Sequence, residues 1–261
     1  MKESAGGDRF LELDDARLRW RIEGSGPSLL LLHGWALDLG SWDLVAALLV
    51  RDFTVLRFDR RGFGLSTGTP DIHRNVGDLA AVLDAAGIER VALLGMSQGA
   101  RLAIHYALQY PQHVRALLLD GAPAVEAETE LPLSQYRALL QQQGESALQA
   151  AVLGHPLMQL HAASASAREV LGAAIAHYRG QDLLHSVARA AAPDLRRLDV
   201  ATLILNGGLD STERRQAGGL LQKSIAAAQR VELTGAGHLA LLDDPQAYAQ
   251  AVTGFLRNVR D

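Results

Sequence analysis

Ser97 lies between two glycines at the end of an apolar run, in a pattern that could present a nucleophilic hydroxyl. The run RVALLGM (90–96) leads into GMSQG (95–99), and a helical pattern follows at once. A G-x-S-x-G sequence between a buried strand and a helix is typical of a nucleophile elbow, in which the backbone bends sharply and exposes the serine Oγ. A plain glycine-bounded turn with a solvated serine is the alternative.

A nucleophilic serine requires a base, and the base requires an orienting carboxylate. His238, in GAGH (235–238), follows the last apolar run of the chain, and Asp210, in GGLD (207–210), follows the run before it. We therefore predict that His238 is the general base and that Asp210 is its partner. Asp120 also ends an apolar run and is the rival acid, whereas Asp59, in FDRRG, is predicted to be structural because it can hold its own loop by local hydrogen bonds.

Acyl transfer also needs two hydrogen-bond donors for the oxyanion of its tetrahedral intermediate. The backbone N–H of Gln98, the residue after the candidate nucleophile, is one predicted donor. The other is the N–H of Trp35 in HGWALD, where Gly34 allows a close approach of the backbone. The Trp35 indole is in addition a candidate for the wall of the substrate pocket, although simple packing also explains it.

The elements that must position these residues alternate between apolar runs and helical patterns. Two runs alternate apolar and polar residues and predict an antiparallel hairpin, and six continuous apolar runs predict strands that are buried on both faces of a parallel sheet. The predicted strands are 10–15, 18–24, 28–33, 53–59, 90–96, 114–120, 201–207 and 230–235, and the clearest helices are 76–86, 97–109 and 245–258. This order predicts an α/β fold with a mostly parallel, doubly wound sheet, in which residues at the carboxyl ends of the strands meet.

One segment interrupts the alternation. Residues 122–193 contain helical patterns without a convincing strand, so we predict a helical cap inserted after the sixth strand, with residues 1–121 and 194–261 forming the core domain. Four residues of the cap are candidates for substrate contact, although helix packing alone would explain each of them: Tyr136, His155, Met158 and His161.

Composition narrows the class of protein. The formal net charge of −4 gives no basic surplus for binding nucleic acid, and the absence of cysteine excludes disulfides and thiol catalysis. The apolar runs are too short to span a bilayer, and the first residues lack the apolar stretch of a signal peptide. We therefore expect a cytoplasmic protein that binds a small molecule, with no nucleic-acid or membrane partner, no cofactor and no metal. The oligomeric state stays open.

On these residues the chain resembles the α/β-hydrolase superfamily over nearly its whole length. The landmarks appear in order as HGW (33–35), DRRGFGLS (59–66), GMSQG, GGLD and GAGH. The first two are most similar to those of arylesterases and cofactor-free haloperoxidases, with enol-lactonases and acyl-carrier methyl-ester esterases close behind. The resemblance implies a serine hydrolase that cleaves small to medium, partly apolar esters or lactones through an acyl-enzyme intermediate.

Two departures from the family pattern bear on the activity. Ala36 stands where members that favour peroxide chemistry tend to carry proline, and Ala100 stands where a second glycine is frequent. A serine at position 97 also argues against haloalkane dehalogenases and epoxide hydrolases, which use aspartate there. Two alternatives remain, namely an acyltransferase or carbon–carbon bond hydrolase with the same triad, and a non-catalytic ligand-binding receptor on a hydrolase scaffold.

Overall fold

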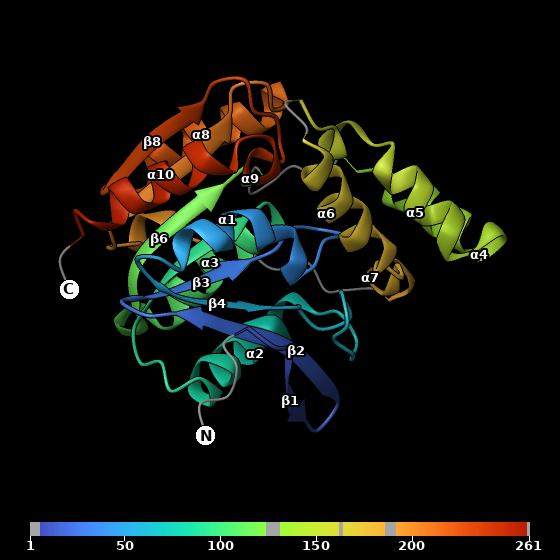
Figure 1. Ribbon diagram of the computed structural model, residues 1–261, viewed down its shortest axis with the longest axis horizontal. Helices are drawn as coiled ribbons and strands as arrows, with labels where there is room; N and C mark the ends of the chain where they lie inside the picture. Colours follow the sequence, from blue (N-terminus) through green and yellow to red (C-terminus); the bar gives the residue numbers. More distant parts are fainter. Residues whose placement is uncertain (1–5, 124–130, 162–163, 186–191, 260–261) are drawn as a thin grey trace.

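One eight-stranded sheet forms the centre of the protein (Figure 1). The computed structural model describes residues 6–123, 131–161, 164–185 and 192–259. The strands are β1 (Arg9–Leu13), β2 (Ala16–Gly24), β3 (Ser28–Leu32), β4 (Thr54–Phe58), β5 (Val91–Met96), β6 (Val114–Asp120), β7 (Thr202–Gly207) and β8 (Ala228–Leu233). They lie in the order β1-β2-β4-β3-β5-β6-β7-β8.

The sheet is parallel from β4 to β8 and antiparallel at its first edge. β1 pairs with β2, and β2 pairs with β4, in antiparallel register, while β3 lies parallel between β4 and β5. The predicted fold class, a mostly parallel doubly wound sheet that begins with a hairpin, is therefore confirmed. Only the last strand differs from its expected burial. β8 was expected to be buried on both faces, but it pairs with β7 alone and exposes Gln229, Val231 and Glu232, because it is the edge of the sheet.

Helices cover both faces of the sheet and form a separate group after β6. They are α1 (Asp43–Leu49), α2 (Ile72–Ala85), α3 (Gln98–Gln109), α4 (Leu133–Gln143), α5 (Glu145–Leu153), α6 (Ala165–Ala176), α7 (Gln181–Leu184), α8 (Thr212–Ser224), α9 (Ala240–Asp243) and α10 (Pro245–Leu256). The described part of the chain also includes the short 3-10 helices η1 (Leu39–Trp42), η2 (Pro111–His113), η3 (Pro156–Met158) and η4 (Leu195–Arg197). Within the described residues, no helix is long and apolar enough to cross a membrane.

Two apolar layers lie on the two faces of the sheet. One is formed with α2, α3 and α8, and includes Leu79, Leu102 and Leu221. The other is formed with α1, α9 and α10 and continues into the helices that follow β6, where Leu148 and Leu171 belong to it. The helices after β6 are therefore anchored to one face of the sheet by shared apolar packing.

We call the helices α4 to α7, together with η3, the helical segment. It lies between β6 and β7 in the chain, and Figure 1 shows α4 and α5 projecting beyond the sheet while α6 lies nearer to it. Within the segment α4 packs on α5 and α7, and α6 packs on η1 of the sheet-bearing part. The predicted cap limits, 122 and 193, fall beside residues 124–130 and 186–191, which are outside the described part of the chain.

Candidate active site

Ser97 occupies a strained bend between β5 and α3. Its φ and ψ are 53° and −114°, in a region that residues with a Cβ rarely adopt. The bend brings backbones so close that a Cβ on Gly95 would lie 2.3 Å from the Gly99 carbonyl oxygen, and a Cβ on Gly99 would lie 2.1 Å from that of Leu32. The Ser97 N–H donates to the Asp120 carbonyl at 2.8 Å, which ties the bend to the end of β6. Such strain persists only where the surroundings enforce it, and it is frequent at functional sites.

His238 and Asp210 form a buried pair at the same edge of the sheet. His238 Nδ1 lies 2.9 Å from Asp210 Oδ2, and Asp210 Oδ1 accepts the Ser211 N–H at 2.7 Å. The two residues are 4% and 5% exposed. A carboxylate on Nδ1 makes this nitrogen the donor, which leaves Nε2 as the nitrogen that can accept a proton. The pair therefore has the geometry expected of a general base and its orienting carboxylate.

Asp120, the rival acid, faces another partner. Its Oδ2 accepts the Tyr248 hydroxyl at 2.9 Å, and among the described residues it has no hydrogen bond to His238. Burial, followed by the nearby Asp210, raises the pKa of Asp120 to about 8. This shift favours the neutral form of the Asp120 carboxyl group, and the geometry favours Asp210 as the partner of the imidazole.

Ser97 Oγ has a neighbour that sequence analysis missed. Arg214 Nη1 lies 3.3 Å from Ser97 Oγ and donates to the Gly121 carbonyl at 2.8 Å. Among the described residues no hydrogen bond joins Ser97 Oγ to His238, although both side chains line one cavity. Arg214 lies in the first turn of α8, four positions after Asp210. This closeness to a predicted site residue was the one signal in the sequence that could have marked it.

The loop after β3 is held against Ser97 by a hydrogen-bonded histidine. His33 Nδ1 lies 2.8 Å from the Gly34 carbonyl, and His33 Nε2 accepts the Arg60 N–H at 3.0 Å. Burial lowers the pKa of His33 well below its usual value, so the ring is neutral and donates from Nδ1. Arg60 Nη2 also donates to the Gly34 carbonyl at 3.0 Å. A Cβ on Gly34 would be 3.4 Å from Ser97 Cβ, which shows how close this loop lies to the serine.

The two predicted oxyanion donors are the backbone N–H groups of the residues that follow Gly34 and Ser97. Among the hydrogen bonds of the described residues, neither the Trp35 nor the Gln98 backbone N–H has an acceptor in the protein. Gln98 is the first residue of α3, where the helix N-terminus favours negative charge. Ala36, the next residue after Trp35, has a φ of 58°. A proline ring cannot adopt this value, so the loop follows a path here that a proline at position 36 would not allow.

Asp59 connects two loops, as its predicted structural role requires. Its carboxylate accepts the Leu39 N–H at 2.7 Å and the Leu65 N–H at 2.8 Å, so the bonds reach beyond its own loop. Burial and the nearby Asp38 raise the pKa of Asp59 to about 6, against the lowering effect of these bonds.

The cavity at Ser97 is small, with a volume of about 10 Å³, and its wall is mostly apolar. Its lining residues are Trp35, Leu37, Met96, Ser97, Leu131, Leu157, Met158, Arg214 and His238. Of the four predicted substrate-contacting residues of the cap, this lining includes Met158 alone. Tyr136 is buried against the Trp35 indole, with ring centroids 5.7 Å apart, and the His155 ring is 6.4 Å from Tyr136. His161 is exposed, and its backbone N–H donates to Asp243.

Trp35 is linked to the helical segment by a carboxylate that sequence analysis did not single out. Trp35 Nε1 donates to Asp182 Oδ2 at 2.8 Å, and the Tyr178 hydroxyl donates to Asp182 Oδ1, also at 2.8 Å. Tyr178 in turn packs edge-on against the Trp35 indole, with centroids 5.3 Å apart. The residue that carries a predicted oxyanion donor is thus fixed through its side chain to α7.

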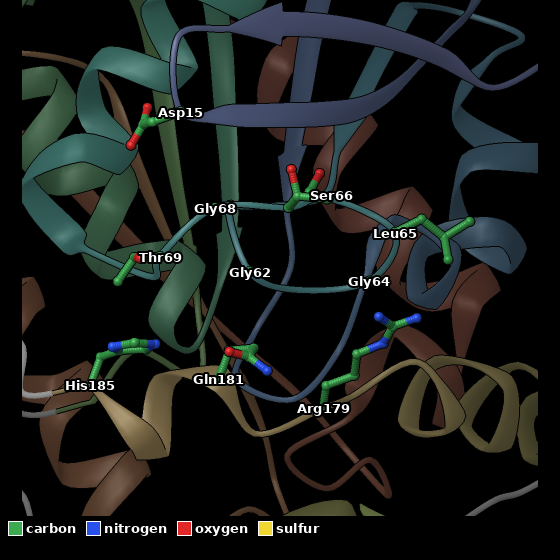
Figure 2. A pocket seen from close by; sticks show the side chains of 11 residues that line it. Asp15, Gly62, Gly64, Leu65, Ser66, Gly68, Thr69, Arg179, Gln181 and His185 are labelled. Carbon is green, nitrogen blue, oxygen red and sulfur yellow. The ribbon is translucent and has the colours of Figure 1, made fainter.

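A second hollow lies apart from the Ser97 cavity, between the glycine-rich loop 62–69 and the start of α7. Figure 2 shows Arg179, Gln181 and His185 on one side of this hollow and the loop on the other. It shares none of its lining residues with the Ser97 cavity. Across the described parts of the chain, no group of His, Asp or Glu side chains is arranged to hold a metal ion.

Comparison with known proteins places this geometry in a family. The sequence profile of the alpha/beta hydrolase fold matches residues 27–173, which is more than half of the chain and includes Ser97. The chain belongs to the α/β-hydrolase family. The resemblance that the sequence landmarks indicated is therefore confirmed.

Relatives and solved structures agree with this assignment. The α/β hydrolase described here is 28% identical over 269 residues to the pimeloyl-[acyl-carrier protein] methyl ester esterase of Pectobacterium carotovorum, covering 92% of this chain and 98% of that one. A hydrolase structure from Pseudomonas aeruginosa has a TM-score of 0.82 and 31% identity, covering 97% and 99% of the two chains. The enol-lactonase of Burkholderia xenovorans shares the fold, with a TM-score of 0.82 and 24% identity over 96% of this chain and 100% of that one.

Proposed function

We propose that this α/β hydrolase cleaves carboxylic esters, lactones included, through an acyl-enzyme intermediate on Ser97. The observation that carries the proposal is the convergence of a strained serine and a histidine–aspartate pair on one cavity. The name of the Pectobacterium relative, a methyl ester esterase, supports the same reaction class. The residues take the roles of nucleophile for Ser97, general base for His238 and orienting acid for Asp210.

In the first half of the reaction, Ser97 Oγ attacks the acyl carbon while His238 Nε2 takes the hydroxyl proton. The carbonyl oxygen becomes an oxyanion, for which the Trp35 and Gln98 backbone N–H groups are the donors. Asp210 stabilises the imidazolium that forms. The carbon–oxygen bond to the alcohol then breaks, and the alcohol leaves with the proton from His238, so that the acyl group stays on Ser97.

In the second half, water replaces the alcohol. His238 takes a proton from the water as it attacks the acyl carbon, and returns it to Ser97 Oγ as the acid is released. For both steps Ser97 Oγ must lie within hydrogen-bonding reach of His238. This contact is frequently long or poorly aligned in the absence of substrate and tightens in the complex.

The cavity wall limits the substrate. Leu37, Leu131, Leu157 and Met158 give the wall an apolar character, so we propose a small to medium, partly apolar ester. Leu157 and Met158 belong to η3 of the helical segment. We propose that this segment acts as a cap, because it contributes both side chains to the wall while the sheet contributes the reacting groups.

Labelling with a fluorophosphonate tests the proposal. The probe should form an adduct on Ser97, and Ser97→Ala should lose both the adduct and, by about 10⁶-fold in kcat, the hydrolysis of short 4-nitrophenyl esters. The exposed Ser224, at the end of α8, provides the matched control, since Ser224→Ala should keep full activity. Folded wild-type protein without an adduct or ester hydrolysis would favour a ligand-binding receptor instead.

A further inference from the structure

We propose that Arg214 directs the Ser97 cavity toward esters that carry a carboxylate a few bonds from the scissile carbonyl. The inference rests on the proposed function, because it names the class of ester that the same nucleophile would attack. It starts from the placement of a buried positive charge beside the serine hydroxyl.

Arg214 brings its charge from another element to the nucleophile. The residue is 4% exposed, and its side chain extends from the first turn of α8 to the end of β6, where Nη1 donates to the Gly121 carbonyl at 2.8 Å. The same nitrogen lies 3.3 Å from Ser97 Oγ. The guanidinium is thus held in the wall of the cavity rather than at the protein surface.

The surroundings strengthen the attraction of this charge for an anion. Leu131, Leu157 and Met158 line the cavity together with Arg214, so the local dielectric constant is low and charge–charge interactions are stronger than in water. A guanidinium binds a carboxylate through short, charge-assisted hydrogen bonds of about 2.7–2.9 Å and can bind both of its oxygens at once. A neutral ester would gain nothing comparable from the same side chain.

Distance limits where the carboxylate can lie. In a reactive complex the scissile carbonyl carbon lies about 3–3.5 Å from the nucleophilic oxygen. Since Arg214 Nη1 is 3.3 Å from that oxygen, a carboxylate oxygen bound to it lies at most about 9–10 Å from the reacting carbon. Because a carbon–carbon bond is about 1.5 Å long, a carboxylate two or three bonds from that carbon lies within this limit. Half-esters of short dicarboxylic acids and acyl esters of 2-hydroxy acids both have this spacing.

Matched substrates that differ in charge and not in shape test the inference. Monomethyl succinate and methyl succinamate place the charge, or its neutral amide equivalent, on the acyl side. Acetoxyacetate and acetoxyacetamide place it on the alcohol side. For at least one pair, wild-type protein should prefer the anion by about 10–10²-fold in kcat/KM, the range expected when a hydrogen bond to a charged group is present in one substrate alone. The pair that shows the preference identifies the side on which the carboxylate lies.

Variants of two cationic residues on α8 test whether Arg214 causes the preference for the anionic ester. Arg214→Gln should lower the ratio to about one, and Arg214→Lys should restore part of it, because lysine keeps the charge but loses the planar fork. Lys223→Gln removes the same charge from an exposed position on the same helix and should leave the ratio unchanged. If Arg214→Gln does not fold, inhibition of the wild type decides. Succinate should inhibit more strongly than succinamide.

A wild-type preference near one for both pairs would overturn the inference, as would a preference that survives in Arg214→Gln or equal inhibition by succinate and succinamide. The proposed function has a separate readout. If Ser97 is still labelled by a fluorophosphonate and the neutral esters are hydrolysed only when Ser97 is present, the charge selection alone fails. If Ser97-dependent hydrolysis is absent from every substrate, the proposed function itself fails.

Discussion

Two regions meet at the cavity, and they place their side chains in different ways. At the carboxyl edge of the sheet, Ser97 follows β5 directly, and Asp210 and His238 lie in the loops after β7 and β8. In the helical segment, Met158 and Asp182 reach the site through side chains whose direction depends on how the helices pack. The backbone of the sheet fixes the first group, whereas side-chain contacts fix the second.

This difference predicts how each region responds to substitution. Substitutions at the sheet edge remove a reacting group or its hydrogen-bond partner, and no neighbouring side chain can take its place. Changes in the helical segment loosen the loop that carries Trp35 and leave the reacting groups in place. We therefore expect losses of very different size from the two regions, and the following experiments compare them.

Asp210→Asn should cause the larger loss, by about 10⁴-fold in kcat, because an amide facing His238 Nδ1 favours the wrong tautomer of the imidazole. Steady-state hydrolysis of 4-nitrophenyl acetate measures it. Asp120→Asn is the matched control, since its carboxyl group faces Tyr248 and should affect kcat much less. The reverse ranking of the two variants would move the orienting acid to position 120.

Asp182→Ala should cause an intermediate loss, of about 10–10²-fold in kcat with little change in KM, since small misplacements of catalytic groups have effects of this size. The substitution removes the acceptor of the Trp35 Nε1–H and of the Tyr178 hydroxyl. Asp182→Asn, which can accept from the indole and donate to the tyrosine hydroxyl, should restore most of the rate.

An exposed aspartate serves as the control for this variant. Asp194 bonds to Arg196 at the surface, so Asp194→Ala should keep the wild-type kcat. A loss of equal size in both alanine variants, or a change confined to KM, would mean that Asp182 does not position the oxyanion loop.

The last effect should appear in stability rather than in rate. With a pKa raised to about 8, folded Asp120 keeps a proton that the unfolded chain releases near pH 3.8, the usual pKa of an aspartate. The folded state binds more protons in this window, so the free energy of unfolding should fall as the pH rises from about 4 to about 8. Asp120→Asn does not titrate and should show a flatter decline. Urea unfolding of both proteins at about pH 5 and pH 8 measures the difference. If the free energy of unfolding changes equally with pH in both proteins, Asp120 is ionised in the folded state.

Much of the fold could be predicted because it depends on local patterns. Continuous apolar runs predicted the parallel strands, and alternation predicted the hairpin of β1 and β2. The burial of β8 was predicted wrongly, since neighbours along the chain do not show which strand forms the edge of a sheet. The predicted cap contacts of Tyr136, His155 and His161 depended on helix orientation, which no local pattern gives, and these residues lie outside the cavity lining.

The sequence by itself determined where the chain bends and which side chains follow each strand, because glycine spacing and apolar periodicity act over a few residues. It therefore placed Ser97, Asp210 and His238 at one edge before any contact was known. Only the tertiary structure decided which aspartate faces the imidazole, and only it brought Arg214 to the serine hydroxyl and Asp182 to the Trp35 indole. These choices join residues far apart in the chain, and they depend on side-chain reach between packed elements.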